Sequence, residues 1–278
     1  MDARILRAIH LMESRIGGDL SMEAIAAEVG LSLFHFHRLF RRCVGETPAD
    51  YLRRIRLDAG ALRLRWTRDS VGAIAGAVGY TSQAAFTRAF NERYGLSPLR
   101  FRKDSLRWPP LPVDGTLGHV AFERESGSHR CIARRYFGPL DLVPRRWRSF
   151  VEELPDFVRR LATGPCIGLV YDDPRFTPPE QIRYDCCIVI DDADFDADAV
   201  RLARRDLREV RTRPGRYICQ PHAGGYADVG KSYSRLLDHW IATSGYSLTD
   251  DPGIEWYATS PARSPEAALD ILLMMPVR

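Results

Sequence analysis

Apolar residues in the N-terminal third of the chain follow the spacing of amphipathic helices. Between residues 33 and 43 the apolar positions fall at i, i+3, i+4 and i+7, which places them on one face of a helix. These positions are Phe36, Leu39, Phe40 and Cys43. A similar stripe returns further along the chain at Phe86, Ala89 and Phe90. The pattern predicts two similar helices, joined by a long helix from about residue 49 to 64.

Each of the two helices follows a shorter helix and a glycine turn. Residues 25–48 and 74–98 align as two copies of one unit, with Gly30 and Gly79 in the turns. Glycine adopts the positive φ of such a turn at little cost. The predicted N-caps of the four helices are, in chain order, Ser21, Ser32, either Asp69 or Ser70, and Thr81. The N-terminal domain is therefore predicted to be all-α, with two helix-turn-helix units.

The C-terminal part of the chain has a different pattern. Strand-like apolar runs such as residues 186–190 alternate with helical stretches, and residues 134–150 align with residues 220–236 as a second internal repeat. Each half predicts the order strand, helix, strand, strand, with helices at about 141–161 and 226–244. We expect an α+β domain of duplicated β-α-β-β units. Both helices would cover one face of a single sheet, and a ligand groove would lie on the other face.

A proline-rich segment separates the two patterns. The 278 residues fit two domains, which we expect at 1–105 and 118–278. The linker at 106–117 contains three prolines, which lack the N–H group that a helix or central strand needs. Residues 1–105 carry 17 Lys and Arg against 11 Asp and Glu, whereas the rest carries 23 against 25. A basic first domain suggests a polyanionic partner.

Composition excludes several classes of protein. The hydrophobic content of 45% and charged content of 27% are those of a globular chain, and the longest apolar run, residues 271–275, is far shorter than a membrane span. Six cysteines without a CxxC pair do not form a disulfide pattern. We expect a cytoplasmic protein without a membrane partner. His35 and His37 point to different sides of their helix, and Gly224 and Gly225 fit no nucleotide-binding motif, so we expect no metal and no cofactor.

One acidic residue interrupts an apolar stretch near the C-terminus. Alternation along IEWYAT places Glu255 and Tyr257 on one face of a strand and Trp256 on the other. A carboxylate among aromatic rings costs free energy unless a partner compensates it. A cationic ligand could be that partner, with cation–π attraction from the rings. An exposed edge-strand glutamate, or one paired with an arginine, fits the pattern equally well.

Residues 8–103 resemble the DNA-binding domain of the AraC/XylS family of bacterial transcription regulators. The resemblance rests on residues 25–60 and 70–102, which include both helix-turn-helix units. In that family two recognition helices of one chain enter successive major-groove segments about 34 Å apart. The resemblance implies that the base-facing residues are Phe34, His37 and Arg38 in the first helix and Gln83, Ala85, Thr87 and Arg88 in the second. Ser32 and Thr81, at the helix N-termini, would hold phosphates.

These residue types agree with the reading of base edges. Arginine pairs with guanine, glutamine with adenine, and threonine or alanine can touch the thymine methyl group. Two residues carry an alternative: Arg38 and Arg88 could instead anchor their turns through salt bridges within their own units. Phe34 is an unusual residue to face a groove.

Residues from about 119 to 278 resemble the GyrI-like small-molecule-binding domain. The matching stretches are residues 134–150, 168–190, 213–246 and 253–261. In that family a glutamate in the strand before the last lies at the base of a groove lined with aromatic rings, and Glu255 occupies this position. The aromatic candidates for the groove are Tyr136, Trp147, Tyr171, Tyr226, Tyr233, Trp256 and Tyr257.

The two resemblances together imply a transcriptional regulator and not an enzyme. It would bind double-stranded DNA through its first domain and a small cationic or aromatic effector through its second. Effector binding would change DNA occupancy or contacts to RNA polymerase. Two alternatives stay open. The second domain could be a small-molecule hydrolase, in which Glu255 with Tyr257 or Tyr226 activates a water, or a protein-interaction module.

Overall fold

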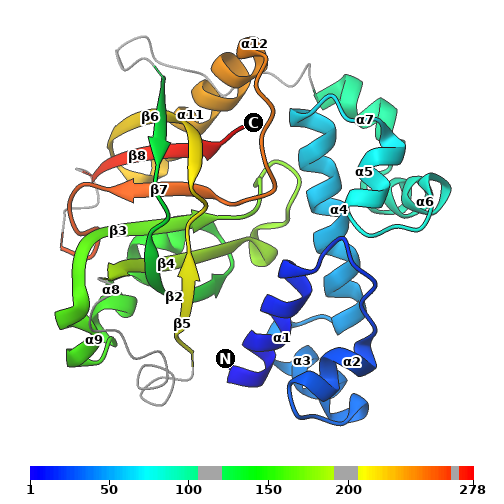
Figure 1. The fold of residues 1–278 in the computed structure, drawn as a ribbon, viewed down its shortest axis with the longest axis horizontal. Helices are drawn as coiled ribbons and strands as arrows, with labels where there is room; N and C mark the ends of the chain where they lie inside the picture. Colours follow the sequence, from blue (N-terminus) through cyan, green and yellow to red (C-terminus); the bar gives the residue numbers. More distant parts are fainter. Residues whose placement is uncertain (106–120, 191–205, 264–268) are drawn as a thin grey trace. The chain divides into compact units, whose positions relative to one another are not determined.

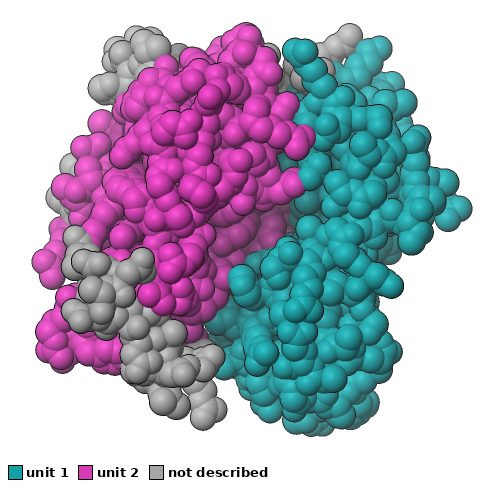
Figure 2. Space-filling view, viewed as in Figure 1, with its two compact units in different colours: residues 1–108 teal, residues 109–278 magenta. Residues whose placement is uncertain are grey.

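The chain forms two compact units, residues 1–108 and 109–278 (Figure 2). A computed structural model describes residues 1–105, 121–190, 206–263 and 269–278. The predicted linker at 106–117 lies outside the described residues. The first unit is built from helices and the second around an antiparallel sheet (Figure 1).

Seven helices make up the described part of the first unit. They are α1 (Ala3–Ser14), α2 (Met22–Glu28), α3 (Leu33–Val44), α4 (Pro48–Trp66), α5 (Val71–Ala77), α6 (Gln83–Tyr94) and α7 (Pro98–Ser105). The pairs α2–α3 and α5–α6 are the two helix-turn-helix units, and α4 joins them (Figure 1). The helical first domain with its connecting helix is confirmed.

The N-caps fix where these helices begin. Ser32 caps α3, and its hydroxyl accepts a hydrogen bond from the backbone N–H of His35 at 3.4 Å. The predicted cap of the second recognition helix at Thr81 is wrong: Ser82 caps α6 and accepts from the N–H of Ala85 at 3.1 Å. Ser82 lies fifty residues after Ser32, and the two apolar stripes are also fifty residues apart. Each cap therefore stands at the same position relative to its stripe. At the start of α5 the cap is Ser70.

The core of the first unit consists of the predicted stripes packed against α4. Phe40 of α3 meets Tyr51 of α4 edge to face, with ring centroids 5.5 Å apart. In the second helix-turn-helix unit, a Cβ at Gly60 of α4 would lie 2.8 Å from the Phe86 ring, so α6 approaches α4 closely. Gly79 is required in its turn, because its φ is +81° and a Cβ would lie 2.6 Å from the Ile16 carbonyl oxygen.

The second unit contains an eight-stranded antiparallel sheet. Its strands are β1 (Phe122–Ser126), β2 (Arg130–Phe137), β3 (Ala162–Val170), β4 (Arg183–Ile190), β5 (Arg208–Arg211), β6 (Gly215–Gly224), β7 (Gly253–Tyr257) and β8 (Leu269–Pro276). The strand order is β1-β6-β8-β7-β3-β4-β2-β5. If each of β1–β4 exchanges its name with the strand four places later in the chain, the order read backwards is the same. Corresponding strands of the two halves therefore occupy equivalent positions in the sheet. The edge strands β1 and β5 were not predicted; their exposed, charged residues give little apolar signal.

Helical segments follow β2 and β6. After β2 come η1 (Leu140–Leu142), α8 (Val143–Glu152) and α9 (Asp156–Leu161); after β6 come η3 (Tyr226–Asp228), α11 (Val229–Ser234), η4 (Arg235–Ile241) and α12 (Ala242–Ser244). The single helix predicted over 141–161 is interrupted between α8 and α9, where Pro155 cannot donate a helical hydrogen bond. The second stretch includes a π-helical segment, η4. A short η2 (Pro179–Gln181) precedes β4.

The two faces of the sheet carry different side chains. Ile254 and Trp256 of β7 belong to a face whose buried cluster also includes Ile167 and Cys187. Glu255 lies on the opposite face, where residues of α8, η3 and α11 surround it. The alternation predicted for residues 254–257 is therefore confirmed.

Candidate functional site

The two recognition helices expose corresponding faces. In α3, Ser32, Phe34 and Arg38 are exposed, and His37 is half-buried. In α6 the exposed candidates are Thr81, Gln83 and Arg88, and the half-buried ones are Ala85 and Thr87. The buried stripes Phe36, Leu39 and Phe40 and Phe86, Ala89 and Phe90 face the core. The nine residues expected at DNA thus lie in the first half of a recognition helix or just before it, away from its core face.

The register of the two caps identifies three further residues, which are Leu33, His35 and Ala84. Because Ser32 and Ser82 occupy the same position, Leu33 corresponds to Gln83, Ala84 to Phe34 and His35 to Ala85. His35 is exposed, and it lines a surface hollow together with Arg38, Leu39 and Arg42. His35 was not among the predicted DNA contacts, although the fifty-residue offset of the repeat places it at the position of Ala85.

Arg38 and Arg88 form no ion pair among the residues that the structure describes. The guanidinium of Arg38 lies 5.9 Å from the centroid of the Phe34 ring, one helical turn earlier. This contact leaves the N–H groups of Arg38 at an exposed surface. The proposed anchoring of each turn by a salt bridge is therefore not seen in the described part of either unit.

The second candidate site is a buried carboxylate held by tyrosines. Glu255 is 1% exposed, and each of its oxygens accepts hydrogen bonds from phenol groups. Tyr184 and Tyr257 donate to Oε2, both at 2.8 Å. Tyr226 donates to Oε1 at 3.0 Å, and Tyr233 lies 3.4 Å from the same oxygen. Four tyrosines from β4, β7, η3 and α11 therefore converge on one side chain.

Trp147 and Gly168 complete the surroundings of Glu255. The Trp147 indole of α8 donates to the Tyr184 hydroxyl at 3.2 Å and meets the Tyr257 ring edge to face. Gly168 lies beside Glu255 on β3. A Cβ at Gly168 would lie 2.0 Å from the Tyr184 hydroxyl oxygen, so this position leaves the space that Tyr184 fills.

Tyr184 was not predicted as a site residue, and Tyr171 and Trp256 lie away from the Glu255 cluster. Tyr184 is the second residue of β4, a largely apolar strand, where its ring looks like ordinary core. Tyr171 is not part of the cluster: it donates to Asp185 at 2.6 Å on the opposite face of the sheet. Tyr136 lies opposite Tyr184 on the same face of the sheet as Glu255 and donates to the Arg146 carbonyl at 3.3 Å, whereas Trp256 packs with the opposite face.

The expected position of the site on the sheet is also wrong. Glu255 was expected on the face opposite the helices, but Trp147, Tyr226 and Tyr233 come from the helical segments and contact its cluster. Alternation shows which side chains share a face, and it does not show which face the helices cover.

Burial and hydrogen bonding act on Glu255 in opposite directions. Burial raises the pKa of the carboxyl group, and the hydrogen bonds from the four tyrosines oppose this rise without cancelling it. Burial also raises the pKa of Tyr184 and Tyr226, so both phenols remain neutral donors. Among the described residues no basic side chain forms an ion pair with Glu255. The cluster supplies hydrogen bonds to a negative charge and no positive charge to balance it.

Comparisons with known proteins find a match in each of the two units. Residues 25–104 match the family of helix-turn-helix domains, and residues 145–278 match the GyrI-like small molecule binding domain. The chain is 33% identical over 146 residues to the right origin-binding protein of Escherichia coli, covering 52% of this chain and 49% of that protein. It is 36% identical over 102 residues to the transcriptional activator RhaS of Escherichia fergusonii, covering 37% of each chain.

The chain carries an AraC-type helix-turn-helix domain followed by a GyrI-like domain. A solved AraC-type regulator from Chromobacterium violaceum is 28% identical, with a TM-score of 0.36; the match covers 38% of this chain and 95% of that one. The chain spans about a third to half of the length of the curated relatives it matches.

Three further features of the described residues bear on other kinds of site. No group of three His, Cys, Asp or Glu residues in the described ranges could hold a metal ion. None of the helices described is long and apolar enough to cross a membrane. His222 bonds the Ser232 hydroxyl at 3.0 Å and the Gly225 carbonyl at 3.2 Å, so its ring nitrogens are used within the fold.

Proposed function

We propose that this protein is a DNA-binding transcriptional regulator whose C-terminal domain binds a small cationic or aromatic effector. The observation that carries the proposal is the pair of helix-turn-helix units on one helix, each with an exposed polar face at the start of its recognition helix. α4 has 19 residues and so is about 28 Å long. A single chain can thus present two recognition helices to one side of a duplex.

The DNA contacts follow from the exposed residues. Arg38 and Arg88 would each donate to a guanine, and Gln83 would pair with an adenine. The backbone N–H groups at the starts of α3 and α6, beside Ser32 and Ser82, would hold phosphates. Thr81 lies one residue before the cap of α6, where its hydroxyl remains exposed for a phosphate.

The effector would bind at Glu255. A cation in this cluster would supply the positive charge that the tyrosine hydroxyls do not, and the rings would add cation–π attraction. We infer a site between the helical segments of two duplicated β-α-β-β units, since Trp147 comes from one half and Tyr226 and Tyr233 from the other. Because Glu255 is 1% exposed, an effector would have to displace some of the side chains that cover it, which come from α8, η3, α11 and the neighbouring strands. The resulting change in this unit would alter DNA occupancy or contact with RNA polymerase.

Binding selection tests the DNA function directly. The purified protein is incubated with random-sequence duplexes, and the bound duplexes are sequenced. We expect a bipartite site with two half-sites about one helical turn apart. In Arg88→Ala, one base pair of one half-site should lose its preference, which corresponds to about 1–3 kcal/mol.

Arg41→Ala is the matched control, because Arg41 is exposed near the C-terminal end of α3. It should weaken binding uniformly or leave it unchanged. Selection of no common sequence would contradict the proposed function. An unchanged base preference in Arg88→Ala would remove Arg88 from the base contacts.

A further inference from the structure

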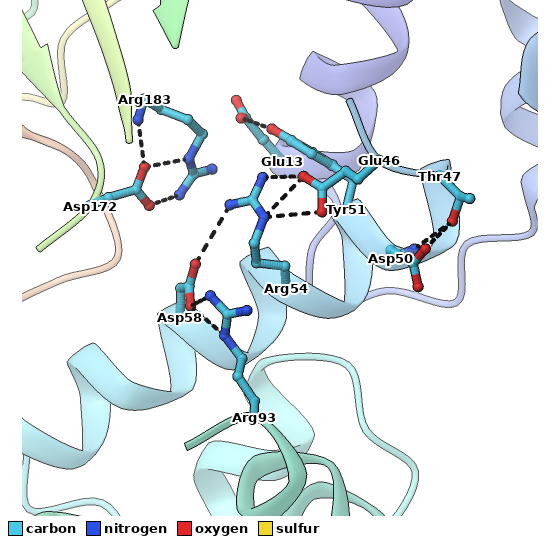
Figure 3. Close-up of polar contacts among 10 residues, drawn as sticks. All are labelled: Glu13, Glu46, Thr47, Asp50, Tyr51, Arg54, Asp58, Arg93, Asp172 and Arg183. Carbon is cyan, nitrogen blue, oxygen red and sulfur yellow. Dashed lines mark hydrogen bonds and ion pairs between the residues drawn. The ribbon is translucent and has the colours of Figure 1, made fainter. Parts of the chain in front are cut away.

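A chain of alternating charges crosses the middle of α4 (Figure 3). Glu46 follows the glycine that ends α3, Arg54 and Asp58 lie one turn apart on α4, and Arg93 lies near the end of α6. Arg54 donates to Glu46 at 2.6 Å and forms an ion pair with Asp58 at 3.6 Å. Arg93 donates to Asp58 at 2.8 Å. We call these four residues the α4 brace.

The centre of the α4 brace is buried. Arg54 is 3% exposed and Asp58 is 1% exposed. Tyr94, the last residue of α6, also donates to Asp58 at 2.6 Å. Burial would lower the pKa of Arg93, but the Asp58 carboxylate outweighs it and keeps that pKa above its ordinary value. The four charges sum to zero, and each buried charge has an opposite charge beside it.

The position of the α4 brace relates it to the recognition helices. Glu46 and Arg93 mark the C-terminal ends of α3 and α6, and both bind residues one turn apart on the same helix. Charge pairs with fixed geometry select one arrangement over neighbouring ones, whereas apolar contacts tolerate sliding. The α4 brace therefore acts on the distance and angle between α3 and α6 and not on their exposed faces.

We propose that Arg54 and Asp58 are positioning residues that set the spacing between the two DNA half-sites the protein accepts. This inference rests on the proposed function. Arg54 and Asp58 are themselves buried beneath the helices and need no contact with DNA.

The test compares affinities for DNA sites of different spacing. The probes are a duplex selected from a random pool, two versions with one base pair inserted or deleted between the half-sites, and a duplex with one half-site scrambled. Fluorescence anisotropy gives the affinity of each duplex for the full-length protein. One base pair changes the spacing by about 3.4 Å and rotates one half-site against the other. The wild-type protein should lose about 100-fold in affinity for the altered spacings.

The main variant is the double substitution Arg54→Met and Asp58→Leu, which removes the two buried charges together. Its penalty for altered spacing should fall to within about tenfold, while its affinity for the duplex with one half-site stays unchanged. A merely structural defect would lower the affinity for the selected duplex and the affinity for the duplex with one half-site together. Tyr94→Phe is the second variant, because it removes one hydrogen bond from Asp58 and keeps the ring; it should relax the spacing in the same direction by a smaller factor.

Glu92→Gln is the matched control. Glu92 of α6 pairs with Arg53 of α4, so this pair also joins α6 to α4. Both side chains lie at the surface, with Glu92 69% and Arg53 47% exposed. This variant should keep the wild-type spacing penalty. Folded variants that all keep the wild-type penalty would overturn the inference and assign the spacing to the packing of Gly79 on Ile16. A wild-type protein that binds the selected duplex regardless of spacing would also overturn it. Failure to select any duplex would instead overturn the proposed function.

Discussion

The two units each bury a carboxylate and compensate it differently. Asp58 and Glu255 are both 1% exposed. Asp58 lies between two arginines and accepts a hydrogen bond from a tyrosine. Glu255 accepts hydrogen bonds from four tyrosines and, among the described residues, pairs with no base. The charge of Asp58 is balanced within the fold, whereas that of Glu255 is not.

A third buried carboxylate lies on the other face of the sheet and resembles Asp58. Asp185 is fully buried and receives hydrogen bonds from Arg135 at 2.5 Å, from Arg208, and from Tyr171. Burial alone would raise the pKa of Asp185, but the two arginines hold it below its ordinary value. The contrast supports the proposal that Glu255 differs from them in role. Under that proposal the balanced carboxylates stabilise the fold, and Glu255 would bind a cationic ligand.

The largest expected effect is the loss of a balanced carboxylate. Asp185→Asn removes the carboxylate that accepts hydrogen bonds from the buried Arg135 and the half-buried Arg208, which should lower the free energy of unfolding by about 3–5 kcal/mol. Urea unfolding followed by near-ultraviolet circular dichroism measures this loss. Asp156→Asn is the control, because its pair with Arg159 lies at the surface and contributes less than about 1 kcal/mol. Equal stability of the two variants would remove the structural role from Asp185.

Glu255→Gln should lower the affinity for a ligand and leave the fold intact. The amide keeps the shape and an oxygen acceptor, so the fold should survive, but an effector cation loses its counter-charge. We expect its affinity for lipophilic cations to fall about 100-fold, which is about 2.7 kcal/mol, the size of a desolvated cation pair. Isothermal titration with a lipophilic cation measures this change.

The DNA affinity of the ligand-free variant is the control for Glu255→Gln and should equal that of the wild type. A cation that binds wild type and variant equally would show that Glu255 is a structural residue like Asp58.

Gly168→Ala sharpens the comparison at the tyrosines. The new methyl group would lie 2.0 Å from the Tyr184 hydroxyl oxygen. Tyr184 is fully buried and held by Trp147 and Glu255, so it cannot move freely. We expect a loss of about 1–3 kcal/mol in stability, as for other overpacked cores. The double variant Gly168→Ala with Tyr184→Phe removes the hydroxyl and should recover much of this loss in the same urea experiment.

An unchanged stability of Gly168→Ala would mean that the cluster can open without cost. Tyr184 would then be free to leave Glu255 when an effector binds, and the tyrosines would act as a movable lining and not as a fixed one.

The sequence predicted the helical unit more completely than the sheet unit. Helix-turn-helix units are local: caps, a turn glycine and a stripe at i, i+3 and i+4 all lie within 25 residues, and only the cap at Thr81 was misplaced by one position. The site at Glu255 joins β4, β7, η3 and α11, which are distant in the chain. Alternation predicted that Glu255 and Tyr257 share a face. It contained no information on Tyr184, since a tyrosine in an apolar strand looks like core until its partner is known.

The α4 brace was hidden for a different reason. Arg54 and Asp58 are charged residues on a long helix, where charges are ordinarily exposed. Their burial depends on how α3 and α6 pack on both sides of α4, and the one-turn spacing alone would equally describe a surface pair.

The smallest expected effect comes from protonation of Glu255. Burial raises the pKa of this carboxyl above its ordinary value of 4.5, so in the window between the two values the folded protein binds a proton that the unfolded chain releases. Its contribution to stability is therefore present below pH 4.5 and is lost as the pH rises through the folded pKa. Asp185, whose pKa is lowered, contributes in the opposite sense and loses its contribution as the pH falls.

Cation binding gives the sharper readout of this shift, because a proton and a cation compete for the same carboxylate. Below the folded pKa the affinity for a lipophilic cation should fall about tenfold per pH unit, or about 1.4 kcal/mol. Binding there should release a proton, which titrations in two buffers of different ionisation enthalpy would detect. Glu255→Gln should lose the pH dependence along with most of the affinity. A cation affinity that is flat with pH around the folded pKa would mean that the proton stays on Glu255 in the complex and that the rings alone bind the ligand.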